Sequence, residues 1–177
     1  TIANGGVAIA RPDGAPLANF SGGGILSFAT LATSRMIFKA NRTSLGSAIA
    51  LLSFTANGST FDSLVFDGNV SGTNRQLYIN GSNDVTISNS TFDGANGSQT
   101  SGFIQAAFAE DLLVENCDFS DLTTAFSGAG IRTDNADDVT LRGCTFDGLT
   151  GSSGGGVYMV QADDLDTYVM DEDDFVL

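Results

Sequence analysis

The stretch "DDVTLRGCTFDG" at residues 137–148 decides the fold, because it returns along the chain in altered form. Earlier copies are "EDLLVENCDFSD" at 110–121 and "NDVTISNSTFDG" at 83–94, and weaker ones are "DSLVFDGN" at 62–69 and "DDLDTYVMDE" at 163–172. When the copies are aligned on the second residue expected to point inward, they give Phe66, Ile87, Val114, Leu141 and Thr167, spaced 21, 27, 27 and 26 residues apart. A recurring period of this length is typical of a repeat architecture.

A second series of apolar residues, each behind a small or glycine-rich lead-in, follows nearly the same period. Its spacings are 18, 24, 28, 26, 28 and 26, and its members are Val7, Ile25, Ile49, Leu77, Phe103, Ile131 and Val157. Within each unit, apolar and polar residues alternate over short stretches, which indicates short strands with one buried face. Such a unit cannot bury its own apolar face and must stack on its neighbours. The sequence therefore predicts an all-β, single-stranded right-handed parallel β-helix of about seven coils, with residues 1–177 as one domain.

Composition agrees with a β-rich chain and limits its partners. The sequence contains 22 glycines, 2 prolines and no tryptophan, as expected for short strands joined by many turns. Its 21 acidic and 7 basic residues give a net charge of −14, which would repel nucleic acid or an anionic membrane surface. The longest apolar run, "SAIALLSF" at 47–54, is far shorter than a membrane-spanning helix, so we expect no membrane insertion. The chain begins at Thr1, which fits either a mature product or a piece of a longer polypeptide.

The repeats "DVTISNSTFDG", "DLLVENCDFSD" and "DVTLRGCTFDG" resemble the coils of the pectate-lyase-like β-helix superfamily, over about residues 60–165. The first half adds "FKAN" (38–41), "FTAN" (54–57) and "FDGN" (66–69), together with "GGGI" and "GSAI". These resemble the F-x-x-N and G-G-A-I repeats of polymorphic outer-membrane proteins and related adhesin passengers. The resemblance implies a solenoid that is secreted or displayed at the cell surface.

Paired acids or amides come directly before the second strand of four successive repeats. The pairs are Asn83-Asp84, Glu110-Asp111, Asp137-Asp138 and Asp163-Asp164. Since a feature that recurs at the period is more often structural than catalytic, we expect a turn whose side chains accept hydrogen bonds from the following backbone amides. The alternative is a weak calcium ladder with ligands Asp111, Asp138 and Asp164; no other cofactor is expected.

Arginine and aspartate gather between residues 132 and 142. This group resembles the acid and base pairs of polygalacturonase-like sites. Its members are Arg132, Asp134, Asp137 and Asp138, with Arg142 nearby. The chain has no histidine, and its predicted loops are too short to wall a sugar-binding cleft. We therefore expect no catalysis, and a polysaccharide lyase or hydrolase using these four residues is the alternative.

One inward position, three residues after the aligned apolar residue, is expected to form an internal ladder. Its members are Asn69, Ser90, Cys117, Cys144 and Met170. Cys117 and Cys144 should be direct neighbours, either as a reduced pair, which we favour, or as a disulfide. Phe146 should likewise stack in the core with Phe92 and Phe119.

The glycosylation signature N-x-S/T occurs seven times in the sequence, which suggests a secreted and glycosylated chain. Asn41 and Asn69 belong to the proposed inner ladder and should carry no glycan. The best candidates are Asn80 and Asn96, followed by Asn19, Asn57 and Asn89.

Together these observations predict an extracellular or cell-surface β-solenoid with a structural or adhesive role. Its expected partners are further copies of itself, stacked end to end into a filament, neighbouring β-helix sequence, or glycans. An enzyme acting on polysaccharides and a carbohydrate-binding β-helix without catalysis are the alternatives.

Overall fold

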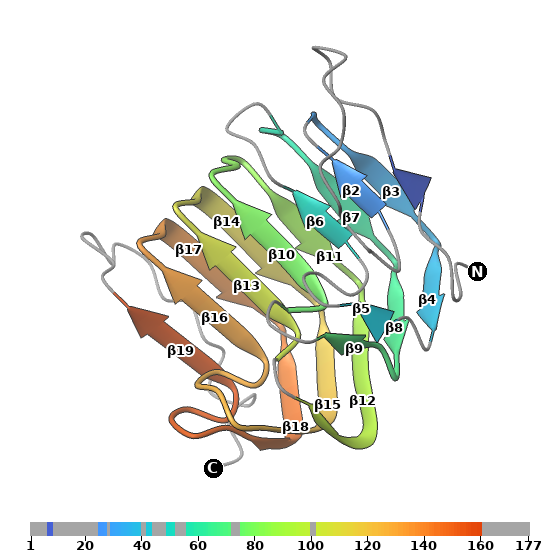
Figure 1. Cartoon of the computed structure of the whole chain (residues 1–177). Helices are drawn as coiled ribbons and strands as arrows, with labels where there is room; N and C mark the ends of the chain where they lie inside the picture. The colour runs from blue at the N-terminus through green and yellow to red at the C-terminus, as the bar shows by residue number, and fades with distance from the viewer. Residues whose placement is uncertain are drawn as a thin grey trace.

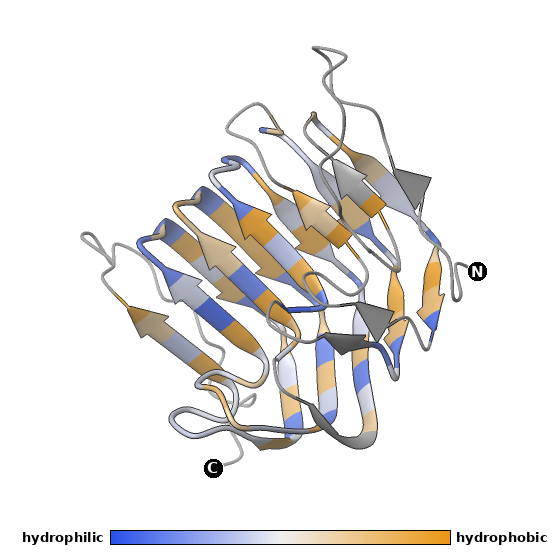
Figure 2. Cartoon of the chain, in the orientation of Figure 1, coloured by the Kyte–Doolittle hydropathy of each residue, from blue (hydrophilic) through white to orange (hydrophobic). Residues whose placement is uncertain are grey.

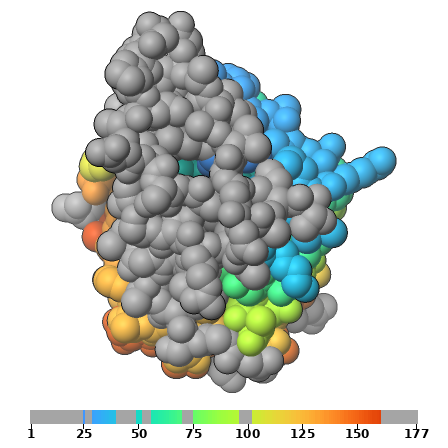
Figure 3. Space-filling view, turned by 45° about the vertical axis from the view of Figure 1, so that its right-hand side comes forward, coloured from blue at the N-terminus to red at the C-terminus, as the bar shows by residue number. Residues whose placement is uncertain are grey.

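Short parallel strands stacked side by side make up the computed structural model, which describes residues 7–8, 25–27, 29–39, 42–43, 49–51, 56–71, 75–99 and 102–160. Figure 1 shows these strands in rows in which segments one repeat apart lie next to one another. In the space-filling view of Figure 3, the early coils (cyan) and the late coils (orange) occupy opposite sides. In the part of the chain that the structure describes, no helix is long and apolar enough to cross a membrane.

The strands form three walls, which the chain visits in turn. The first wall has seven strands: β1 (Val7–Ala8), β2 (Ile25–Ser27), β6 (Ile49–Leu51), β10 (Leu77–Asn80), β13 (Ile104–Ala107), β16 (Ile131–Asp134) and β19 (Val157–Val160). The second has five: β3 (Ala32–Ser34), β7 (Thr60–Asp62), β11 (Thr86–Ser88), β14 (Glu110–Glu115) and β17 (Asp137–Arg142). The third also has five: β4 (Ile37–Lys39), β8 (Val65–Asp67), β12 (Thr91–Gln99), β15 (Asp118–Thr124) and β18 (Thr145–Thr150). A short pair of strands, β5 (Arg42–Thr43) and β9 (Val70–Ser71), lies beside them.

Neighbouring strands in every wall are parallel, so the predicted parallel β-helix is confirmed. Within the described residues, five coils have one strand in each of the three walls. This number is smaller than the seven coils expected from the sequence. Parallel strands need a long crossover between them, and here each crossover is the remainder of one coil.

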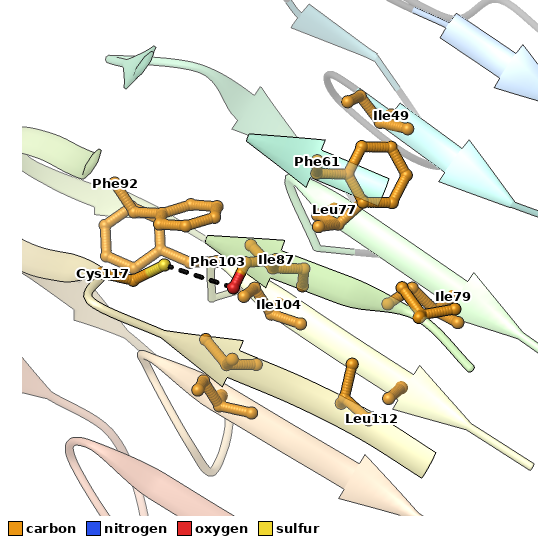
Figure 4. Packing of buried hydrophobic residues seen from close by; sticks show 14 of the residues in the cluster. Ile49, Phe61, Leu77, Ile79, Ile87, Phe92, Phe103, Ile104, Leu112 and Cys117 are labelled. Atoms are coloured by element: carbon orange, nitrogen blue, oxygen red, sulfur yellow. Dashed lines mark hydrogen bonds between the residues drawn. The ribbon is translucent and has the colours of Figure 1, made fainter. Parts of the chain in front are cut away.

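Alternate residues fill the interior in strands such as β6, β10, β14 and β16. In β10, Leu77 and Ile79 are fully buried, whereas Tyr78 and Asn80 are partly exposed. Figure 2 shows this alternation as orange and blue bands along the strands. Figure 4 shows Ile49, Leu77 and Ile104 following one another from strand to strand. The buried apolar side chains form one continuous cluster, which provides the main driving force for stacking the coils.

A stack of phenylalanines runs through the core behind the third wall. Phe38, Phe66, Phe92, Phe119 and Phe146 follow one another with ring centroids 5.1, 4.5, 4.7 and 4.9 Å apart and with interplanar angles of at most 13°. The predicted stack of Phe92, Phe119 and Phe146 is confirmed, and it extends by two rings toward the N-terminus.

The register corrects two of the sequence alignments. Ile87 pairs with Phe61, and Phe66 pairs with Phe92, so the spacing of 21 residues after Phe66 reflected a wrong partner. Asn69 therefore leaves the predicted ladder, and the residue preceding Ser90 in that ladder is Leu64, whose backbone nitrogen donates to the Ser90 hydroxyl at 3.1 Å.

In the first wall, Leu77 pairs with Ile104 instead of Phe103. Phe103 is fully buried and packs against Phe92 and Phe119, at 5.8 and 6.1 Å between ring centroids. The alignment chose Phe103 because two apolar residues stand next to each other there, and both turn out to be buried.

The paired acids stand at a corner where the backbone is left-handed. The second residue of each described pair has a positive φ, 54° at Asp84, 54° at Asp111 and 50° at Asp138, and Gly58 in the preceding coil has a φ of 70°. Aspartate, asparagine and glycine tolerate this conformation better than other residues. The recurrence of acids at the period therefore has a backbone cause.

The hydrogen bonds at this corner differ from the expected turn. Asn57 Oδ1 accepts from the Asn83 backbone nitrogen at 2.9 Å, and Asn83 Oδ1 accepts from the Glu110 backbone nitrogen at 3.2 Å. The side chains therefore link successive coils instead of closing their own turn. At Asn83 the prediction of a bond to a following amide of the same turn was wrong, because it treated the corner as an isolated turn.

Phe108 occupies another left-handed corner, at a φ of 52°, and its side chain is 56% exposed. The equivalent residues of the neighbouring coils are Gly81 and Asn135. Since asparagine suits this backbone better than phenylalanine, we expect Phe108→Asn to stabilise the protein by about 0.5–1 kcal/mol. Urea denaturation would measure the change. Phe126→Asn is the matched control, since Phe126 is similarly exposed but is not among the residues with positive φ; an equal gain there would contradict the backbone explanation.

Candidate functional site

Polar and aromatic side chains form a row across the outer face of the first wall. Tyr78, Gln105, Arg132 and Tyr158 pair successively in the parallel register of β10, β13, β16 and β19. The first three alternate with buried neighbours on their strands, whereas the neighbours of Tyr158 are partly buried. We call these four residues the outward row. Because adjacent strands lie about 4.8 Å apart, the row spans roughly 14 Å from Tyr78 to Tyr158.

An ion pair lies on this face, between two residues of β16. Arg132 donates from Nε to both carboxylate oxygens of Asp134, at 3.0 and 2.9 Å, and from Nη2 to Oδ1 at 2.6 Å. Gln105 Nε2 donates to Asp134 Oδ2 at 2.8 Å. The Arg132 guanidinium also lies 5.6 Å from the centroid of the Tyr158 ring, within cation–π distance. These contacts hold Gln105, Arg132 and Tyr158 in one fixed arrangement.

The electrostatics follow from these contacts. Burial raises the pKa of Asp134, but the hydrogen bonds from Arg132 and Gln105 and the nearby positive charges outweigh it, so that its pKa lies below the usual value. The hydrogen bond to Asp134 raises the pKa of Arg132. Burial, with a smaller contribution from the Asp134 charge, raises the pKa of Tyr78. At neutral pH the pair is therefore charged on both sides and the tyrosine is neutral.

Arg75 lies two residues before the start of β10 and is only 2% exposed. It donates from Nη1 to the carbonyl oxygen of Gly128 at 2.9 Å and from Nη2 to that of Ser127 at 2.7 Å. Burial, and then repulsion from Arg132, lower the pKa of Arg75 to about 10, so it stays protonated at neutral pH. Arg75 acts as a strut that ties the segment before β16 to the coil of β10.

The predicted catalytic residues fall into two places. Arg132 and Asp134 lie on the outer face of β16, whereas Asp137 and Asp138 come after a left-handed corner at Asn135, at the start of β17 in the second wall. Arg142 lies further along β17 and forms an ion pair with Glu115. The contacts that the structure gives Asp134 come from Arg132 and Gln105, not from the aspartates of β17.

A family model described as "right handed beta helix region" matches residues 32–167. The chain belongs to the right-handed β-helix family. No curated protein and no solved structure gives a significant match to the sequence. The family identifies the coil architecture of this β-helix, whereas the resemblance to adhesin passengers stays a prediction.

The proposed calcium ligands Asp111 and Asp138 stand at one corner of successive coils of the β-helix. Among the described residues, no three His, Cys, Asp or Glu side chains are grouped as a metal ion would require. Asp164, the third predicted ligand, lies outside the described residues.

The two cysteines of the β-helix are free and buried. The Thr145 backbone nitrogen donates to the Cys117 carbonyl oxygen at 2.9 Å, which places Cys117 and Cys144 in adjacent coils as predicted. The Cys117 thiol lies 3.8 Å from the Ile87 carbonyl oxygen (Figure 4), and the Cys144 thiol lies 3.5 Å from that of Val114. Each thiol therefore faces a carbonyl oxygen of the preceding coil. Met170, also predicted in this ladder, lies outside the described residues.

The hydrogen bond with Cys144, and then burial, raise the pKa of Cys117 above its usual range. Because the thiolate is the reactive form, we expect both thiols to resist a disulfide-exchange reagent in the folded protein at mildly alkaline pH. Both should react once the protein is unfolded in guanidinium without reductant. A protein that shows no free thiol after unfolding would instead contain the alternative disulfide.

The predicted glycosylation sites have different environments. Asn57 and Asn89 are exposed, and the Asn89 side-chain amide donates to Asp62 at 2.8 Å. Asn80 is partly exposed at the end of β10. Asn96 belongs to β12, and Asn19 and Asn41 lie outside the described residues. Asn69 is buried and donates to the Phe38 carbonyl oxygen at 2.8 Å, so it is shielded from modification as expected.

Sequence reasoning missed Tyr78, Gln105, Tyr158 and Arg75 as site residues. Tyr78, Arg132 and Tyr158 each directly follow a residue of the second apolar series, so that an outward residue is expected there. The repeat pattern therefore predicted an outward residue at each of these positions. Gln105 was missed because Phe103 was aligned in place of Ile104, the residue that directly precedes Gln105.

Proposed function

We propose that this β-helix is a non-catalytic module of a secreted or cell-surface protein, and that it adheres by binding glycans on the outer face of its first wall. The observation that carries the proposal is the outward row. It combines aromatic rings with fixed hydrogen-bonding groups on one face. Aromatic surfaces with a few fixed polar groups are typical of small-molecule recognition.

The state of the charged pair supports binding over catalysis. A general acid for glycoside cleavage needs a raised pKa, whereas the pKa of Asp134 is lowered. Arg132 is engaged by the same carboxylate. Both groups are thus suited to orienting hydroxyl groups, and Asp134 lacks the raised pKa of a general acid.

Two assays on the purified protein test this proposal together. Retention on immobilised polysaccharides is expected, and no new reducing ends or unsaturated products should appear with calcium or with a chelator. Sustained product release that Asp134→Asn abolishes would instead support the lyase or hydrolase. Absence of retention on any glycan would contradict the adhesive role.

We also propose that coils of separate copies, or of neighbouring sequence, continue the stack. Each wall joins its coils through repeated backbone hydrogen bonds, for example from Leu77 to Phe103 at 2.8 Å and from Ile104 to Gly130 at 2.9 Å. A further coil would need only the same pattern. Electron microscopy is expected to show filaments of this β-helix, and a concentration-independent monomer by sedimentation would contradict this part of the proposal.

A further inference from the structure

The outward row also indicates which class of glycan it would bind, an inference that rests on the proposed function. Arg132 is the cation of the row, and its charge is already compensated by Asp134 through three hydrogen bonds of 3.0 Å or less. Arg75, a second cation whose charge acts on Arg132, is 2% exposed and bonded to two backbone carbonyls. A carboxylate or sulfate on a sugar would therefore find no uncompensated positive charge at the row.

The whole chain adds to this effect. Its net charge of −14 repels anions from the surface generally, since the summed field acts beyond single contacts. Two further cations form ion pairs on other walls. Lys39 in β4 pairs with Asp67, and Arg142 in β17 pairs with Glu115. An acidic polysaccharide would thus be disfavoured both at the row and on approach.

The groups that remain available suit an uncharged sugar. Arg132 uses Nε and Nη2 on Asp134, so its Nη1 group is left to donate to hydroxyl oxygens. Gln105 uses Nε2 on the same carboxylate, which leaves its side-chain oxygen to accept from a hydroxyl. A fixed donor beside a fixed acceptor matches two neighbouring hydroxyl groups of a sugar ring.

The tyrosines set the direction of the ligand. Tyr78 and Tyr158 stand at the two ends of the row, three coil steps apart, or roughly 14 Å. This separation is about the length of three linked hexose rings, and the row runs across the strands. A linear oligosaccharide would therefore run along the axis of the β-helix, so that each sugar meets the next coil.

We infer that the outward row binds an uncharged linear oligosaccharide laid along the helix axis, with sugar rings against Tyr78 and Tyr158 and hydroxyl groups on Gln105 and Arg132. Such a ligand buries apolar sugar faces against the tyrosine rings. It needs no counter-ion from the protein.

Titration calorimetry tests this inference with linear oligosaccharides of glucose or mannose and with an oligogalacturonate of the same length. We expect the neutral sugars to bind more tightly, with affinity that rises up to about three or four units and is unchanged by added sodium chloride. Tyr158→Ala and Tyr78→Ala should each weaken binding about tenfold. Tyr158→Phe should bind nearly as well, because it keeps the ring. Thr140→Ala, on the outer side of β17 in the second wall, is the matched control and should leave binding unchanged.

The outcomes separate this inference from the proposed function. Tighter binding of the galacturonate, weakened by salt, would overturn the preference for neutral sugars but keep the adhesive role. Neutral sugars that bind equally to the two alanine variants would overturn the assignment to the outward row. If neither class of sugar binds but the protein is retained on another immobilised polysaccharide, this inference fails and the proposed function stands, whereas absence of retention on any glycan overturns both.

Discussion

Replacing Phe92 by alanine is expected to destabilise the protein by about 3–5 kcal/mol, the range seen when a buried aromatic residue is truncated. Phe92 is fully buried and lies in the middle of the phenylalanine stack, with its ring centroid 4.5 Å from that of Phe66 and 4.7 Å from that of Phe119. The substitution removes both stacking contacts and leaves a cavity between coils that cannot close, because the backbone spacing of the coils is fixed by their hydrogen bonds. Since small domains have only about 5–15 kcal/mol of stability, this loss is a large share of the free energy of unfolding. Denaturant titration followed by circular dichroism would measure the loss.

Phe126→Ala is the matched control for this change. Phe126 is 46% exposed, so the same substitution should alter the free energy of unfolding by less than about 1 kcal/mol. If both variants lost similar stability, the stack of rings would not be the element that holds the coils together.

Gly102→Ala is expected to destabilise the protein by about 3 kcal/mol, at the upper end of the usual effect of overpacking. A Cβ atom at this position would lie 2.1 Å from Nη1 of Arg75, 2.3 Å from the carbonyl oxygen of Ala129 and 2.7 Å from that of Gly128. The backbone oxygens belong to the next coil and cannot move without breaking the register of the first wall. Thermal unfolding should show a lower midpoint with retained strand content at low temperature.

Gly58→Ala separates this steric effect from the general effect of losing a glycine. Gly58 has a φ of 70° and open space around its Cβ position, so alanine there should cost only about 1 kcal/mol through backbone strain. Adding Arg75→Met to Gly102→Ala removes one of the three close contacts. The double variant should therefore lose less free energy of unfolding than the two single variants lose together. A Gly102→Ala protein as stable as the native one would show that the coils can shift apart freely.

The repeat period was enough to predict the fold, because stacking copies is the only way for such short strands to bury their apolar residues. The phenylalanine stack followed for the same reason: Phe92, Phe119 and Phe146 recur at 27-residue intervals. What the sequence did not reveal was the register where two apolar residues are adjacent or where a coil changes length. Phe66 and Phe103 were each assigned to a neighbouring ladder for this reason.

The candidate site was only partly predictable. Arg132 and Asp134 stood out because they resemble, together with the aspartates that follow, the acid and base pairs of polygalacturonase-like sites. Grouping them with Asp137 and Asp138 assumed that neighbours in sequence share a face. The left-handed corner at Asn135 turns the chain between them. Such a turn depends on bonds to the next coil, here from the Asn135 nitrogen to the Val160 carbonyl oxygen at 2.9 Å, and no local pattern reveals those.

The Arg75 strut has a consequence for how the molecule unfolds. Repeat proteins are usually described by contacts between adjacent units alone, so that terminal units can fray one at a time. Arg75 crosses the intervening coil at Gly102 and bonds to Ser127 and Gly128 two coils away, which adds a second-neighbour coupling to that description. The three coils that begin at β10, β13 and β16 should therefore open as a single cooperative block, with similar amide hydrogen-exchange protection across them.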